Sequence, residues 1–169
     1  MVARAGLRCR MTPVDYAQYM RAAPSAAPAA AAPGELGDGA VVVVDEAMVA
    51  HAWTALVAGG DPTAHAAMGA IRGAARWLGR PSLSGVTVFS TVEPCKTGVG
   101  ALLQSDGDGL VHALRDPIGG ACGSSLQLAE TPGRPRRLGV VSGILQLAAT
   151  ELRPDVVLDR AEARPAAVR

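Results

Sequence analysis

Aromatic residues are scarce in this chain of 169 residues, of which they make up only 3%. Apolar residues nevertheless account for 49% of the chain, and most of them are Ala, Val and Leu. A core built from such small side chains allows helices to pack closely on a sheet. The length is that of one ordinary domain, so a second domain is not expected.

An excess of charge of either sign is also missing. The chain has 16 basic and 15 acidic residues, which leave a formal net charge of +1. Proteins that bind nucleic acids usually carry a basic patch that neutralises phosphates. A nucleic-acid partner is therefore not expected, and we predict a small-molecule ligand instead.

Disulfide and membrane signals are absent as well. The three cysteines are odd in number and irregularly spaced, and no segment has the pattern of a signal peptide. The longest apolar stretch, residues 22–32, contains Pro24 and Pro28 and is shorter than the roughly 20 residues that cross a bilayer. We expect a reduced, cytoplasmic protein without a membrane anchor.

Strand-like and helix-like segments alternate along the chain, which is typical of an α/β layered domain. We predict one domain over residues 14–160, with a flexible N-terminal extension at 1–13 and a loose tail at 161–169. Ser142 is predicted to cap the last helix. The predicted strands are 41–44, 48–53, 86–90, 110–114 and 138–141, and the predicted helices are 14–23, 63–78, 95–104 and 143–152.

Two predicted helix starts carry side chains that can bind a metal or act as nucleophiles. The first is Pro62-Thr-Ala-His-Ala-Ala and the second is Thr91-Val-Glu-Pro-Cys-Lys-Thr-Gly. They place His65 and Cys95 at the positive ends of two helices. This arrangement resembles the signature of the zinc deaminases, in which a His-x-Glu start and a Pro-Cys-x-x-Cys start meet at one zinc ion.

The resemblance to the cytidine deaminase superfamily, in its tRNA-adenosine and guanine deaminase branch, extends over residues 14–158. Trp53 matches the Trp of the family's Trp-Asn turn, and segments 114–117 and 119–125 resemble its Arg-Asp-Pro and Gly-Ala-x-Gly-Ser loop. The resemblance implies a three-layer α/β/α fold with a central mixed sheet. It also implies a homodimer.

The sequence departs from the family at three functional positions. Ala67 stands where the family has its catalytic Glu, and Gly98 stands where it has its second Cys ligand. Thr54 replaces the Asn that holds the base. A catalytic zinc site needs three protein ligands, and only His65 and Cys95 remain in register. We therefore expect no metal cofactor.

The residues that remain favour a different chemistry. Without a metal, the fold would bring Cys95 and His65 together, and a thiol next to an imidazole is a usual nucleophile and base pair. We therefore predict a repurposed, non-deaminase enzyme that acts on a small molecule, with Cys95 as nucleophile and His65 as base. The residues predicted to contact its substrate are Thr54, Ala67, Lys96, Gly98 and Asp116.

Two alternatives stay open. One is a non-catalytic protein, either a ligand-binding protein or the inactive partner subunit of a deaminase. The other is a zinc-dependent nucleobase deaminase with an unusual third ligand, for which Cys122 is the candidate beside His65 and Cys95, and with Glu93 as the proton shuttle.

Overall fold

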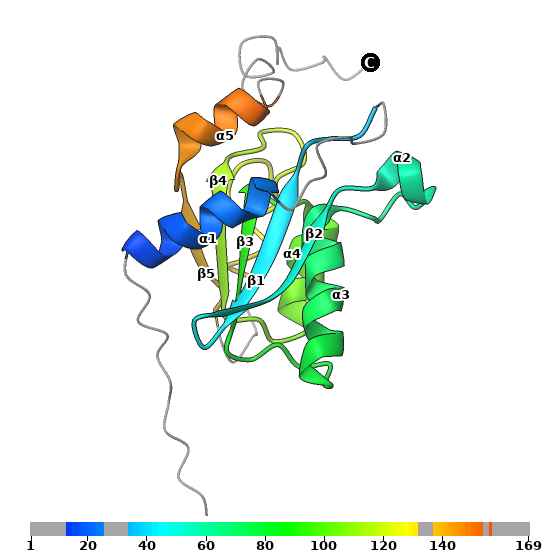
Figure 1. The fold of residues 1–169 in the computed structure, drawn as a ribbon, viewed down its shortest axis with the longest axis vertical. Helices are drawn as coiled ribbons and strands as arrows, with labels where there is room; N and C mark the ends of the chain where they lie inside the picture. The colour runs from blue at the N-terminus through cyan, green and yellow to red at the C-terminus, as the bar shows by residue number, and fades with distance from the viewer. Residues whose placement is uncertain (1–12, 26–33, 132–136, 154–155, 157–169) are drawn as a thin grey trace, which may run out of the picture.

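The computed structural model describes residues 13–25, 34–131, 137–153 and 156 (Figure 1). The predicted N-terminal extension at 1–13, apart from Pro13, and the predicted tail at 161–169 lie outside these residues. No helix in the described part of the chain is both long and apolar enough to cross a membrane.

The centre of the fold is a five-stranded mixed sheet with the order β2-β1-β3-β4-β5. The strand β1 pairs antiparallel with β2 and β3, whereas β3, β4 and β5 are parallel. All five predicted strands are present. Their bounds are Gly39–Val44 for β1, Ala47–Trp53 for β2, Val86–Val92 for β3, Gly109–Leu114 for β4 and Gly139–Ser142 for β5.

The valine run that predicts the first strand forms β1, which is almost completely buried between two neighbouring strands. A two-residue turn joins β1 to β2, with both Asp45 and Glu46 at positive φ. This is the usual geometry of a tight hairpin whose twist matches that of its strands. The strand β2 forms one edge of the sheet and is partly exposed.

The helix α3 (Ala66–Leu78) packs on β2 with very little space between backbones. A Cβ atom added to Gly69 would lie 2.7 Å from the Cβ of Ala52, and one added to Gly73 would lie 3.1 Å from that of Ala50. Real Cβ atoms essentially never approach as closely as at position 69, and a Cβ at position 73 would require Ala50 to shift by a few tenths of an ångström. The small residues thus set the distance between the helix and the sheet.

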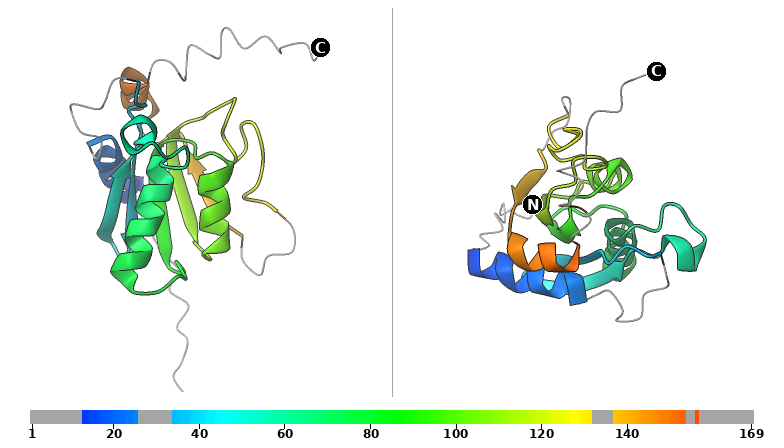
Figure 2. Two further views of the ribbon diagram at one scale, coloured as in Figure 1. Left: turned by 90° about the vertical axis from the view of Figure 1, so that its right-hand side faces the viewer. Right: turned by 90° about the horizontal axis from the view of Figure 1, so that it is seen from above.

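Two layers of helices enclose the sheet (Figure 2). The helices α3 and α4 (Lys96–Gln104) cover one face, and α1 (Pro13–Ser25) and α5 (Gln146–Leu152) lie on the other. Phe89 of β3 contacts Tyr16 and Tyr19 of α1, with ring centroids 6.1 and 5.3 Å apart. The predicted three-layer α/β fold with a mixed sheet is confirmed.

The structure corrects three local details. Ser142 ends β5 instead of capping a helix, and α5 begins only after a turn in which Gly143 and Leu145 have positive φ. The helix α3 begins at Ala66, three residues later than predicted. An additional short helix, α2 (Leu56–Gly59), has its first amides bound by the carboxylate of Glu35.

Candidate functional site

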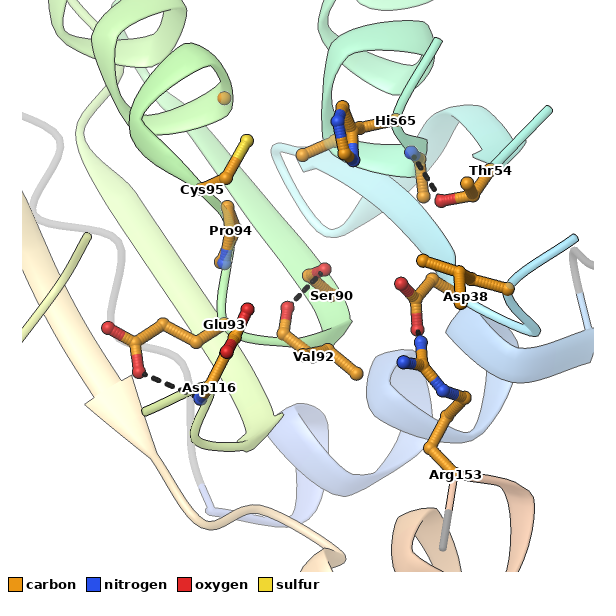
Figure 3. Close-up of a pocket in the computed structure, with 14 residues that line it drawn as sticks. Asp38, Thr54, His65, Ser90, Val92, Glu93, Pro94, Cys95, Asp116 and Arg153 are labelled. Carbon is orange, nitrogen blue, oxygen red and sulfur yellow. Dashed lines mark hydrogen bonds and ion pairs between the residues drawn. The ribbon is translucent and has the colours of Figure 1, made fainter. Parts of the chain in front are cut away.

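A cavity of about 100 Å³ lies where the N-terminal ends of α3 and α4 (Lys96–Gln104) approach each other at one end of the sheet. Its walls come from six separate parts of the chain, and Figure 3 shows the residues of these walls. The residues that line it are Leu36, Asp38, Thr54, His65, Ala66, Ala67, Ser90, Val92, Glu93, Pro94, Cys95, Gly98, Asp116 and Arg153.

His65 and Cys95 are the N-cap residues of α3 and α4. Both have extended backbone conformations, and neither caps its helix with its own side chain. Figure 3 shows them on the two helix starts, on opposite sides of the pocket. In the described part of the chain, no hydrogen bond joins the Cys95 thiol to the His65 ring. Both side chains therefore face the pocket as separate groups.

Thr54 lines the pocket but has a structural hydrogen bond of its own. Its Oγ1 accepts a hydrogen bond of 3.1 Å from the backbone amide of Ala66, the first residue of α3. The first amides of a helix have no partner within it, so a side chain from elsewhere can satisfy one of them. Thr54 thus fixes the start of the helix that carries His65.

Glu93 is buried and holds the loop between β4 and β5. Its Oε1 accepts hydrogen bonds from the amides of Cys122, at 2.7 Å, and Ser124, at 3.2 Å. Its Oε2 accepts from the amide of Asp116, at 3.3 Å, and from the Ser124 hydroxyl. A Cβ on Gly120 would lie 2.6 Å from the Glu93 carboxyl carbon, so the loop backbone passes directly beside it. These contacts favour a structural role for Glu93 over proton transfer.

The loop held by Glu93 carries Asp116 to the pocket. The Oδ1 atom of Asp116 accepts hydrogen bonds of 2.9 Å from the amides of Ile118 and Gly119. Such bonds are typical of an Asp that closes a turn onto the following backbone. The Asp116 side chain is thus held at the pocket wall by its own loop.

Two of the predicted candidates lie outside the pocket lining. Lys96 is exposed in the first turn of α4, because successive helix residues point about 100° apart and Cys95 faces the pocket. Cys122 is buried in the core. Its burial, together with the charge of Glu93, raises the pKa of the thiol to about 12. Cys122 does not line the pocket, and the described residues contain no group of three side chains that could hold a metal ion, so Cys122 is not placed as the third ligand that the zinc alternative requires.

Ala67 and Gly98 line the pocket and lie close to each other, as the resemblance implies for the two replaced positions. A Cβ on Gly98 would be 3.3 Å from the Cβ of Ala67 and 3.2 Å from that of Pro94. Both distances are shorter than ordinary van der Waals contacts. The starts of α3 and α4 are thus packed around a residue that has no side chain.

Sequence reasoning missed an ion pair in the pocket wall. Arg153, which follows α5, and Asp38, which precedes β1, form a salt bridge and are both largely buried. They lie 115 residues apart in the sequence, and neither belongs to a motif. No local signal in the sequence could have identified this pair.

A family model described as the cytidine and deoxycytidylate deaminase zinc-binding region matches residues 13–113. The chain belongs to this family. A tRNA-specific adenosine deaminase of Bacillus subtilis is 34% identical over 128 residues, which cover 76% of this chain and 80% of the relative. One of Haemophilus influenzae is 35% identical over 129 residues, which cover 76% and 75%.

A solved structure from a study of A-to-I editing by tRNA:A34 deaminases is similar to this fold, with a TM-score of 0.74 and 30% sequence identity. The match covers 80% of this chain and 98% of that one. The fold and the predicted branch of the superfamily are thus confirmed from both sequence and structure.

These relatives overturn the predicted activity. The hypothesis of a repurposed, non-deaminase enzyme acting on a small molecule, with Cys95 as nucleophile and His65 as base, is wrong. Relatives that are 34–35% identical over three quarters of the chain are named for the deamination of adenosine in tRNA.

The residues present do not fit the zinc ion that the family model implies. Among the described residues, no group of three or more His, Cys, Asp and Glu side chains is placed to hold a metal ion. Position 98 supplies no donor atom, and its neighbours leave little room for a side chain.

Proposed function

We propose that the pocket between α3 and α4 recognises a purine base. This proposal rests on the agreement between the position of the pocket and the names of the relatives. The pocket lies where the motifs of the deaminase signature meet, and the relatives covering three quarters of the chain are named for adenosine deamination. Deamination of such a base is accordingly the reaction to assay first.

The pocket walls suit a flat heterocycle. Most ligand sites combine apolar walls with a few polar groups that fix orientation. Here Leu36 and Val92 supply apolar surface, and His65 and Cys95 supply polar groups at opposite sides. A cavity of about 150 Å³ is known to bind benzene. The smaller cavity of about 100 Å³ therefore encloses part of a base and leaves the rest at its open mouth.

A free base, a nucleoside and a tRNA share the same purine chemistry, and the titration described below distinguishes them. The balanced charge of the chain favours the free base or nucleoside. We further propose a cytoplasmic homodimer, whose oligomeric state can be checked by light scattering.

A calorimetric titration tests the proposal. The wild-type protein is titrated with adenine, guanine, adenosine and a tRNA in turn. The mass of each recovered ligand is then measured by mass spectrometry to detect loss of the amino group. We expect at least one purine to bind. Replacing His65 with Ala should weaken that binding by about tenfold, which corresponds to about 1.4 kcal/mol.

The matched control is His51→Ala, because His51 is exposed on β2 and does not line the pocket. This variant should bind as the wild type does. The proposal is refuted if none of the four ligands binds, or if His65→Ala and His51→Ala bind the purine equally well.

A further inference from the structure

We infer that this chain, by its own residues, does not hold a zinc ion in the deaminase pocket. The inference goes beyond the proposed function, because it concerns the metal and not the base. It conflicts with the description of the matched family region as zinc-binding. It rests on the donors that the pocket contains and on the packing around Gly98.

The first argument is the number of donors. A zinc site with an open position takes three protein ligands, which are His, Cys, Asp or Glu side chains. His65 and Cys95 both line the pocket, and the described residues include no group of three side chains that could hold a metal ion. Two protein ligands leave the ion largely to water, so it is readily lost.

The second argument concerns the carboxylates in the pocket wall. The carboxylate of Glu93 receives four hydrogen bonds from the loop that follows β4, and that of Asp116 receives two. Asp38 forms a salt bridge with Arg153. Moving any of these groups to an ion would break interactions that hold the pocket wall. They are therefore not substitutes for the missing ligand.

The third argument is the space at position 98. A Cβ there would be 3.2 Å from Pro94 and 3.3 Å from Ala67, so a side chain requires its neighbours to shift by a few tenths of an ångström. The close approach of Ala67 thus suits the absence of a side chain at Gly98. A glycine in this place removes the donor atom that a cysteine would supply, and the starts of α3 and α4 pack closely around it.

The experiment measures zinc directly. Wild-type protein is produced in zinc-supplemented medium, purified without chelators and dialysed, and its zinc content is determined by plasma mass spectrometry. The same proteins are titrated with Co²⁺, whose absorption reports thiolate ligands. The variants are Gly98→Cys alone and together with Ala67→Glu.

A matched control is Gly100→Cys, which adds a thiol to the same helix at a position where a Cβ has no neighbour within 4 Å. We expect zinc far below the amount of protein in the wild type and in Gly100→Cys. In Gly98→Cys, and in the double variant, we expect zinc to rise to about one ion per chain, as in a three-ligand site.

Stoichiometric zinc in the wild type that is lost on replacing Cys95 with Ser would overturn the inference. A folded Gly98→Cys variant without zinc would overturn the assignment of position 98 as the missing ligand. If this variant does not fold, the wild-type zinc content decides alone. No purine is present in any sample, so failure of the proposed base binding does not affect the result.

Discussion

Glu93→Gln tests whether the buried carboxylate holds the pocket loop. A glutamine has only one acceptor oxygen. We take this oxygen to keep the hydrogen bonds from the amides of Cys122 and Ser124. The NH₂ group of the glutamine then faces the amide of Asp116, so that two hydrogen-bond donors face each other. An orphaned buried donor costs about 1–3 kcal/mol, and loss of the charge weakens the remaining bonds by about 1 kcal/mol.

We therefore expect Glu93→Gln to lower the free energy of unfolding by roughly 3 kcal/mol. With a urea dependence of about 2 kcal/mol/M, the midpoint of urea unfolding shifts down by about 1.5 M. Glu130→Gln is the matched control, because Glu130 is an exposed carboxylate in the same loop. Its effect should stay within about 0.5 kcal/mol. Equal midpoints for the two variants would refute a clamping role for Glu93.

Two further perturbations test the packing and the pH dependence of the fold. Gly69→Ala should destabilise the protein by about 1–3 kcal/mol, because its Cβ would lie 2.7 Å from that of Ala52. A Cβ at position 100 of α4 would have no neighbour within 4 Å, so Gly100→Ala should instead stabilise the protein by about 1 kcal/mol. If thermal unfolding finds Gly69→Ala at least as stable as Gly100→Ala, the described packing of α3 on β2 is contradicted. Burial lowers the pKa of His112 below its ordinary 6.5, so the unfolded chain takes up a proton first. Stability should thus fall by up to about 1.4 kcal/mol per pH unit as the pH drops below 6.5. In urea unfolding measured from pH 7 to 5, His112→Gln should reduce the dependence of the unfolding free energy on pH. His51→Gln, at an exposed position on β2, should leave this dependence unchanged. Equal pH dependences in the two variants would contradict a neutral, buried His112 ring.

Most of the fold could be predicted because its strands are short, β-branched runs between turn residues. The run Val41–Val44 becomes the buried strand β1, and the alternation of strands and helices gives the layered fold. The errors in the predicted elements lie where contacts with residues distant in the sequence determine the local structure. The helix α2 depends on Glu35, whose carboxylate binds amides more than 20 residues away. The turn that delays α5 depends on Gly143 pairing with β4.

The site was predicted less completely than the fold. The two helix starts were identified from short motifs, and the structure brings His65 and Cys95 to one pocket. Their predicted chemistry was wrong, because the relatives at 34–35% identity are named for adenosine deamination, an activity that the types of residue in two short motifs do not reveal. The salt bridge of Asp38 and Arg153 was missed, since it joins the beginning of the sheet to the end of the last helix.

Equilibrium dialysis of the wild-type protein against a purine and zinc together tests the central claim most directly. Base and metal are then quantified in the same protein chamber. The account predicts that the purine accumulates with the protein while zinc stays at the level of the buffer. Zinc in an amount equal to that of the protein, or no purine above the buffer level, would contradict it.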